Sequence, residues 1–327
     1  MKGKNRMSFD ALLGNEQLKM NLRRSLAVGH ISHFYLISGP AGSGKHTLAK
    51  LLAAAILCQG ADKPCLTCRA CRKVMDGAHP DFITVDDPEK KTVPVDLIRQ
   101  ARADMYIQPN ESEHKIYLFP RAQDMGLPGQ NALLKVLEEP PSYGVFILLA
   151  DNPNKLLPTV RSRCTELKLL PLSREECIRQ LRADFPNAQA ADWEAAYLRS
   201  GGCLGQAKEL LANGEQTPPQ TNAWLEALCQ RSPLLLIEAL VPLEKWKRDA
   251  LAPLMDSWIA ITEEALASRS GLEAVTPAAR QLAAAYTSIE LMKVLAALQK
   301  SSLYLKSNVS PGAVCGYLEW QLQIPKK

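Results

Sequence analysis

The chain has 327 residues, enough for two or three domains, and 46% of them are hydrophobic and 22% charged. This composition is that of an ordinary globular protein and excludes wholesale disorder. The apolar run 51–58 is too short to cross a bilayer, which takes about 20 residues. No apolar segment follows the basic N-terminus, so we expect no secretory signal and a cytoplasmic protein.

The net charge of +5 reflects 39 basic and 34 acidic side chains. Residues 213–327 hold 11 basic and 11 acidic ones, so the whole excess lies in residues 1–212. Such a mild excess fits weak contact with nucleic acid or with a nucleotide and is diagnostic of neither.

Short apolar segments in the first half of the chain predict buried strands at 34–38, 82–86, 115–119, 145–150 and 165–170. Helical patterns lie between them, at 47–57, 95–106 and 129–138. Near-continuous apolar strands that alternate with helices are typical of a parallel sheet covered on both faces. We therefore predict an α/β core.

After Pro171 the sequence predicts only helices. Ser173 and Glu176 have the spacing of a capping box at the start of the first one. The segment 214–221 has the composition of a linker, and residues 222–324 carry Leu, Ala and Trp at helical spacing. The tryptophans of this last region suit either its internal core, the commoner case, or packing against another protein.

The segment Gly39–Lys45, GPAGSGK, fits the first part of a P-loop between an expected strand and an expected helix. Glycines allow backbone N–H groups to turn toward a phosphate, and the helix N-terminus adds positive potential. The candidate nucleotide-binding residues are Gly39, Gly42, Gly44, Lys45 and Thr47.

This loop departs from the P-loop pattern at His46, where Ser or Thr would hold Mg²⁺. Imidazole is a poor ligand for Mg²⁺, and Thr47 is rotated about 100° around the helix from that position. Two interpretations stay open: a loop that binds ATP or ADP, and a loop kept only for its shape.

The third expected strand ends in Pro120 and Arg121, where P-loop hydrolases carry acidic residues for Mg²⁺ and for the attacking water. Neither residue can bind the metal or accept a proton from water. Asp124 comes several residues too late. We therefore do not expect this chain to hydrolyse ATP alone.

Four of the nine cysteines, Cys58, Cys65, Cys68 and Cys71, follow the P-loop helix closely. Four thiolates complete the tetrahedral shell of a structural zinc site, and they leave no open position for catalysis. An iron–sulfur cluster is the rival, but the Cys-Pro that follows in one such pattern is missing. Unliganded cysteines are the third interpretation.

Taken together, the motifs of residues 8–212 resemble those of the bacterial clamp-loader subunits of the AAA+ family. Besides the P-loop and the cysteines, the resemblance rests on short segments at 9–10, 15–16, 33–36, 78–81, 130–135, 137–141 and 162–164. It implies an AAA+ P-loop core at 1–171 with a zinc knuckle at 58–71, a helical lid at 172–212 and an all-α collar for oligomerisation at 213–327.

The Ser-Arg-Cys arginine of this family points into the nucleotide site of the neighbouring subunit, so the resemblance makes Arg163 a candidate arginine finger in trans. A structural arginine is the alternative, and Arg161 stands two residues away. Asp151 or Asn152 matches the sensor position after the fourth strand. The lid arginine of the hydrolysing members is absent near Gly205.

These departures imply a non-motor subunit of the delta-prime type. The implied partners are the motor (tau or gamma) and delta subunits in a pentameric ring, with the sliding clamp and primer-template DNA reached through the complex. An ATP-hydrolysing motor subunit is the main rival. A third reading, direct DNA binding, rests on basic residues of the first 24: Lys2, Lys4, Arg6, Lys19, Arg23 and Arg24.

Overall fold

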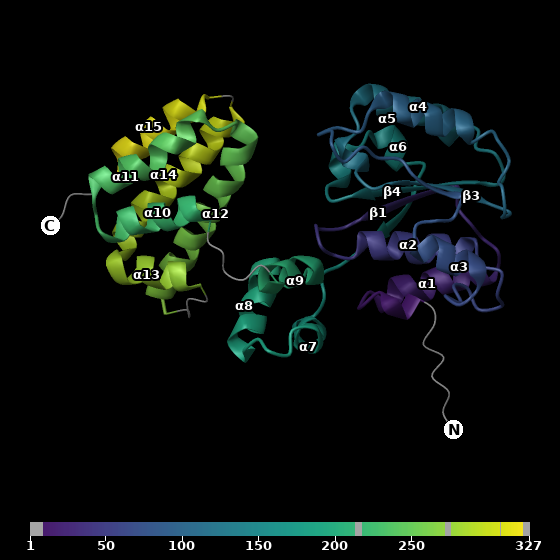
Figure 1. The fold of residues 1–327 in the computed structure, drawn as a ribbon, viewed down its shortest axis with the longest axis horizontal. Helices are drawn as coiled ribbons and strands as arrows, with labels where there is room; N and C mark the ends of the chain where they lie inside the picture. The colour runs from purple at the N-terminus through teal and green to yellow at the C-terminus, as the bar shows by residue number, and fades with distance from the viewer. Residues whose placement is uncertain (1–8, 213–217, 272–275, 308, 323–327) are drawn as a thin grey trace. The chain divides into compact units, whose positions relative to one another are not determined.

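The computed structural model describes residues 9–212, 218–271, 276–307 and 309–322. The chain divides into two compact units, Met1–Ala212 and Asn213–Lys327 (Figure 1). Within the described ranges, no helix is both long and apolar enough to cross a membrane.

The first unit is built on a parallel sheet, as the alternating pattern predicted. The order of its strands is β2-β3-β4-β1-β5. Its strands are β1 (Phe34–Ser38), β2 (Phe82–Thr84), β3 (Lys115–Phe119), β4 (Gly144–Ala150) and β5 (Thr165–Lys168). The residues of β1, β3 and β4 are buried throughout, because helices cover both faces. In a parallel sheet all carboxyl ends share one edge, so the loops after β1, β3 and β4 lie together.

Helices α1 to α3 cover one face of the sheet and α4 to α6 the other (Figure 1). Their bounds are α1 (Glu16–Ala27), α2 (Lys45–Ile56), α3 (Arg69–Met75), α4 (Val95–Asp104), α5 (Leu127–Glu138) and α6 (Pro158–Arg161). Short 3-10 turns are η1 (Phe9–Ala11), η2 (Ala122–Asp124) and η3 (Pro153–Lys155). Each face has its own apolar core, one centred on α2 and the other on α4 and α5.

Three helices complete the first unit: α7 (Arg174–Asp184), α8 (Ala190–Ser200) and α9 (Leu204–Ala212). The capping box at the start of α7 is confirmed, because the Ser173 and Glu176 side chains each bond the other residue's backbone. Gly201 and Gly202 take positive φ between α8 and α9. A small core that includes Cys177, Leu181 and Trp193 holds these helices together.

The second unit is all helical in its described residues. Its elements are α10 (Pro219–Cys229), α11 (Pro233–Leu240), η4 (Val241–Lys245), α12 (Arg248–Arg269), α13 (Pro277–Ala285), α14 (Ser288–Lys306) and α15 (Pro311–Leu322). Trp224 and Trp258 are fully buried and stack with ring centroids 4.7 Å apart, so these two belong to the internal core. Trp320 is 71% exposed.

The linker expected at 214–221 is wrong in its second half. Helix α10 already begins at Pro219, whose fixed φ and missing N–H suit a first helical turn. Residues 213–217 lie outside the described ranges.

Candidate nucleotide site and cysteine cluster

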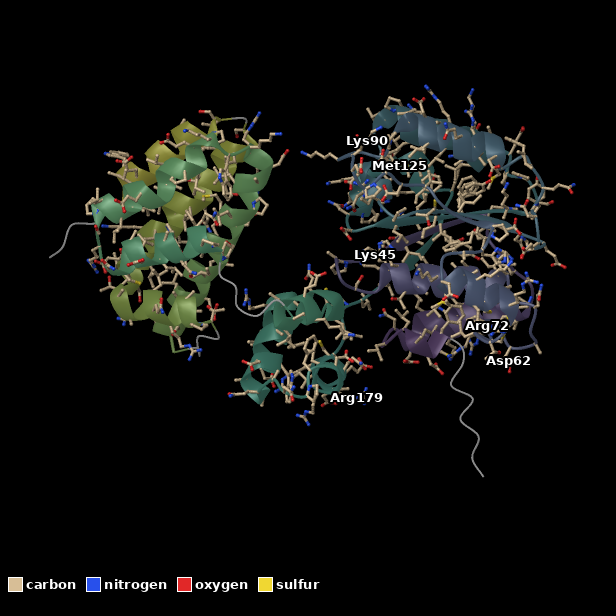
Figure 2. All side chains as sticks on the ribbon, viewed as in Figure 1. Lys45, Asp62, Arg72, Lys90, Met125 and Arg179 are labelled. Carbon is tan, nitrogen blue, oxygen red and sulfur yellow. The ribbon has the colours of Figure 1, made fainter. Side chains whose placement is uncertain are left out.

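The P-loop lies at the carboxyl edge of the sheet, between β1 and α2, with Lys45 at the helix start (Figure 2). The Lys45 side chain is buried, and its ammonium donates to the carbonyls of Gly39 at 2.8 Å and Pro40 at 2.7 Å. It also forms an ion pair with Asp151, with 2.5 Å between Nζ and Oδ1. The cation that would meet a phosphate is therefore neutralised by a carboxylate from the end of β4.

Gln123 fixes Asp151 in this position. Its carbonyl oxygen accepts from the backbone N–H groups of Asp151 and Asn152, and its amide donates to Asp151 Oδ2 at 3.2 Å. Of the two sensor candidates, Asp151 is the one that faces Lys45, whereas the Asn152 side chain caps the turn η3. Sequence reasoning missed Gln123, whose one signal was a polar side chain soon after β3.

A cavity of about 460 Å³ opens beside the P-loop and is walled by the loop, the residues after η1 and the helices α7 and α9. This volume is within the range of small-molecule sites. His46 and Thr47 both line it. Burial, and then the charge of Lys45, lower the pKa of His46, while Asp151 opposes them more weakly. The imidazole is therefore neutral at pH 7, and it brings no charge to the cavity.

The start of helix α9 contacts the P-loop through a main-chain hydrogen bond. The Gly205 N–H donates to the Gly42 carbonyl at 2.8 Å. A Cβ placed on Gly205 would lie 2.8 Å from Gly42 Cα, closer than side chains ever come. In this arrangement position 205 has no room for any side chain, so the arginine that the resemblance led us to look for there would not fit.

Arg121 is engaged by the loop after β2. Its Nε and Nη2 bond the Asp86 carboxylate, with Nη2 to Oδ1 at 2.6 Å. Its remaining N–H groups donate to the carbonyls of Asp87 at 2.8 Å and Lys90 at 3.0 Å. Directly after β3, where P-loop hydrolases carry acidic residues, the chain therefore has a cation that is bonded to the loop after β2.

Arg163 lies between α6 and β5, at the end of the sheet where the strands begin. Its guanidinium donates to the Thr159 carbonyl at 3.0 Å and stands 3.8 Å from Glu138 Oε1. The second distance is too long for a hydrogen bond, and the side chain remains 41% exposed. By contrast, Arg161 donates to the Asn154 side chain at 2.8 Å.

The four clustered cysteines meet in space. Their sulfurs all lie within 4.8 Å of one another, and those of Cys65 and Cys71 are 4.0 Å apart. A tetrahedral zinc ion with Zn–S bonds of about 2.3 Å holds its sulfurs about 3.8 Å apart. The donor set and spacing therefore fit a structural zinc ion.

The backbone around the cysteines is arranged to stabilise thiolates. Main-chain N–H groups donate to sulfur at 3.3 to 3.4 Å: Gly60 and Cys65 to Cys58, Cys68 to Cys65, and Cys71 to Cys68. Burial opposes the thiolate of Cys65, but hydrogen bonds from Thr67 and Cys68 outweigh it and lower its pKa to about 6. The cluster lies beyond the end of α2, about 18 Å along the helix from Lys45 (Figure 2).

The basic residues near the N-terminus give little support to direct DNA binding. Lys19 is buried, donates to the Leu12 carbonyl and pairs with Glu16. Arg23 pairs with Asp10. Lys2, Lys4 and Arg6 lie outside the described residues.

Comparison with known proteins gives consistent matches. Residues 14–173 match the family model described as DNA polymerase III, delta subunit. DNA polymerase III subunit tau of Bacillus subtilis is 37% identical over 158 residues, which are 48% of this chain and 28% of that one. Subunit delta' of Pseudomonas aeruginosa is 34% identical over 186 residues, 56% of this chain and 57% of that one.

Among solved structures, a gamma subunit-related protein of Thermotoga maritima covers 94% of this chain and 98% of its own, at 18% identity and a TM-score of 0.43. The parallel sheet with helices on both faces and a P-loop between β1 and α2 is the architecture of an α/β P-loop protein. The family model, which matches residues 14–173, and the curated matches support a clamp-loader member of the AAA+ proteins, as the motifs predicted. The match spans 57% of the delta' relative and less of the tau relative.

Proposed function

We propose that this chain is a non-motor subunit, of the delta-prime type, in a bacterial DNA polymerase III clamp loader. It would help to load the sliding clamp onto primed DNA. The observation that carries this proposal is Arg121, bound to Asp86 where a hydrolysing subunit needs acids. A guanidinium can neither bind Mg²⁺ nor accept a proton from water.

In this proposal residues 1–171 form the AAA+ core, 172–212 the lid and 213–327 the collar. Three features around the P-loop support a site without turnover: the Lys45 pair with Asp151, the neutral His46, and the bond from Gly205 to the P-loop. Gly39, Gly42, Gly44, Lys45 and Thr47 would then bind ATP or ADP weakly, or only shape the loop.

Arg163 would act on the nucleotide of a neighbouring subunit. Its position at the amino edge of the sheet, against the carboxyl edge for the P-loop, supports a role in trans. The four residues of β5 alone span about 13 Å between the two edges. Its guanidinium bonds the Thr159 carbonyl and pairs with Glu138 at 3.8 Å, and it stays exposed enough to turn toward a phosphate outside the chain, where it would stabilise charge in the transition state.

Contact with the other loader subunits is proposed for the second unit. Helix α14 exposes Ile289, Met292 and Leu303. Their spacings of three and eleven residues place them on one face of the helix. An apolar stripe of this kind supports packing against helices of the motor and delta subunits in a ring.

The test is ATP turnover of a reconstituted loader, stimulated by clamp and primed DNA, with this chain wild-type or carrying Arg163→Ala. An arginine finger contributes on the order of 10³-fold or more at the site it serves, so turnover at the neighbouring site should collapse while gel filtration shows intact assembly. Arg161→Ala is the matched control and should leave turnover unchanged. Equal turnover in both variants would make Arg163 a structural residue.

The alternative is an ATP-hydrolysing motor subunit of the same loader. The similarity to tau and gamma subunits favours it, as does the carboxylate of Asp151 beside Lys45. ATP hydrolysis by the isolated chain, abolished by Lys45→Ala, would establish this alternative and exclude the non-motor role.

A further inference from the structure

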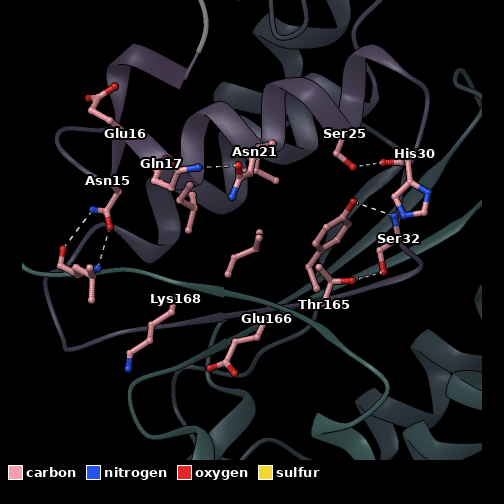
Figure 3. Close-up of a pocket in the computed structure, with 15 residues that line it drawn as sticks. Asn15, Glu16, Gln17, Asn21, Ser25, His30, Ser32, Thr165, Glu166 and Lys168 are labelled. Carbon is pink, nitrogen blue, oxygen red and sulfur yellow. Dashed lines mark hydrogen bonds between the residues drawn. The ribbon is translucent and has the colours of Figure 1, made fainter.

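A groove of about 600 Å³ lies between helix α1 and strand β5 (Figure 3). Lys45 is not among the residues that line it. Its lining includes Leu22, Tyr35 and Leu167, which are buried and apolar. Polar side chains form its rim, among them Gln17 and Asn21, which bond each other at 3.0 Å. An apolar floor with a polar rim is typical of a binding groove.

One wall of the groove is the open edge of the sheet. Strand β5 is last in the order and, within the described ranges, pairs with β1 alone. The Leu169 N–H donates to the main-chain carbonyl of Ser38 in β1 at 2.7 Å, so the main-chain groups of Leu169 face toward β1. Since alternate residues of a strand face opposite neighbours, those of Glu166 and Lys168 face outward. Among the residues that the structure describes, these outward groups have no main-chain partner.

At the next outward position, Leu170, a side-chain amide bonds the main-chain groups that a neighbouring strand would otherwise bond. The Asn15 amide accepts from the Leu170 N–H at 2.9 Å and donates to the Leu170 carbonyl at 3.2 Å (Figure 3). Asn15 is the N-cap residue of α1, yet its side chain makes no capping bond. The amide instead satisfies the main-chain groups of Leu170.

The other end of the open edge is also closed by side chains. Thr165 donates to the Ser32 hydroxyl at 3.0 Å, and the Ser32 N–H donates to the Tyr35 hydroxyl at 2.9 Å. The groove is therefore tied at both ends, and the span between them, Glu166 to Lys168, remains available for pairing.

We propose that an extended peptide segment of a partner protein adds to β5 as an antiparallel strand, with an acidic residue opposite Lys168, an apolar residue opposite Leu167 and a basic residue opposite Glu166. Open strand edges recognise extended chains through main-chain hydrogen bonds, and adjoining pockets select alternate side chains. This proposal is independent of the role of the chain in ATP turnover.

Antiparallel geometry fits this short span. Residues opposite Glu166 and Lys168 would each exchange two main-chain hydrogen bonds with them, which satisfies all four outward groups. The residue between them shares the face of Leu167, which belongs to the apolar core under α1, so its side chain enters the groove. Opposite charges directly across two strands stabilise the pair, and like charges destabilise it.

The test uses the full-length chain and two labelled eight-residue peptides in fluorescence anisotropy. The centre of the first peptide reads aspartate, leucine, lysine from its N-terminus, and the centre of the second reads lysine, leucine, aspartate. We expect saturable binding of the first peptide and binding at least about tenfold weaker of the second. The double variant Glu166→Lys with Lys168→Glu should reverse this preference.

A third peptide carries N-methyl groups on the aspartate and lysine amides, which removes the two donors aimed at β5. It should bind at least about tenfold more weakly than the first peptide. Equal binding of the methylated peptide would show that side chains alone fill the groove and would overturn strand addition. So would absence of saturation at about 1 mM, and neither result depends on the folding of a variant.

Discussion

The N–H of Gly205 donates to the carbonyl of Gly42 across 2.8 Å, which joins the start of helix α9 to the turn of the P-loop. Both residues are glycines for a steric reason. A Cβ on Gly42 would lie 2.5 Å from the backbone nitrogen of Gln206, and one on Gly205 would lie 2.8 Å from Gly42 Cα. The lid and the phosphate loop therefore move together or lose this contact.

Gly205→Ala should separate the lid from the P-loop. The added methyl meets backbone atoms that cannot rotate away, and overpacking of this kind destabilises by about 1–3 kcal/mol. Hydrogen exchange followed by mass spectrometry should show faster exchange in α9 and in the P-loop. Gly316→Ala in α15 is the control, because no atom lies within 4 Å of its added Cβ. Equal exchange in both variants would mean that the lid does not rest on the loop in solution.

Asp151→Asn should strengthen nucleotide binding. The substitution removes the carboxylate that pairs with the buried Lys45 ammonium and leaves this charge for a phosphate. Because the Asp151 side chain is 45% exposed, screening limits the gain, and we expect an increase of several-fold in the affinity for ADP. Isothermal titration calorimetry measures it, with the exposed Asp96→Asn as control. A weaker affinity in the Asp151 variant would instead make Asp151 a ligand of the nucleotide or of its metal.

Zinc content tests the cysteine cluster. We expect one zinc ion per chain in protein purified without chelator, measured by plasma mass spectrometry. Cys68→Ser should abolish it and loosen α3, because the ion would no longer tie the start of that helix to Cys58 and Cys65, although a serine can still cap the helix. Cys229→Ser, in the second unit and outside the cluster, should keep the full zinc content. A wild-type protein that contains iron, or no metal, would contradict the assignment of zinc to the four cysteines.

The parts of this fold that sequence could predict are those with a local pattern. The strands β1, β3 and β4 are continuous apolar runs, and the spacing of Cys58, Cys65, Cys68 and Cys71 is sufficient to indicate a metal site. The start of α10 was missed because a proline pair marks a linker as well as a first helical turn.

Contacts between residues far apart in the sequence had no such signal. Nothing in Arg121 itself names Asp86 as its partner, and nothing in the sequence indicates that the amide of Asn15 bonds the backbone of Leu170. The sequence showed that acids and a lid arginine were missing. Only the structure shows what stands in their place, an internal ion pair and a glycine on glycine contact.

The carboxylate of Glu290 should make the second unit sensitive to acid. Hydrogen bonds from the Thr287 backbone and from Arg231 lower the pKa of Glu290 to about 2, although partial burial opposes them. A depressed folded-state pKa means that the carboxylate stabilises the fold above the ordinary glutamate value and that this contribution is lost as the pH falls toward 2. Wild-type stability should therefore decline between about pH 5 and pH 2.

In Glu290→Gln this part of the decline should be absent, and the variant should be less stable than the wild type at pH 7, because Arg231 loses its charged partner at 3.0 Å. Urea unfolding at a series of pH values, followed by tryptophan fluorescence, measures both effects, since Trp224 and Trp258 are buried in this unit. The exposed Glu238→Gln is the matched control and should keep the wild-type profile. An acid decline of wild-type size in Glu290→Gln would assign it to other carboxylates.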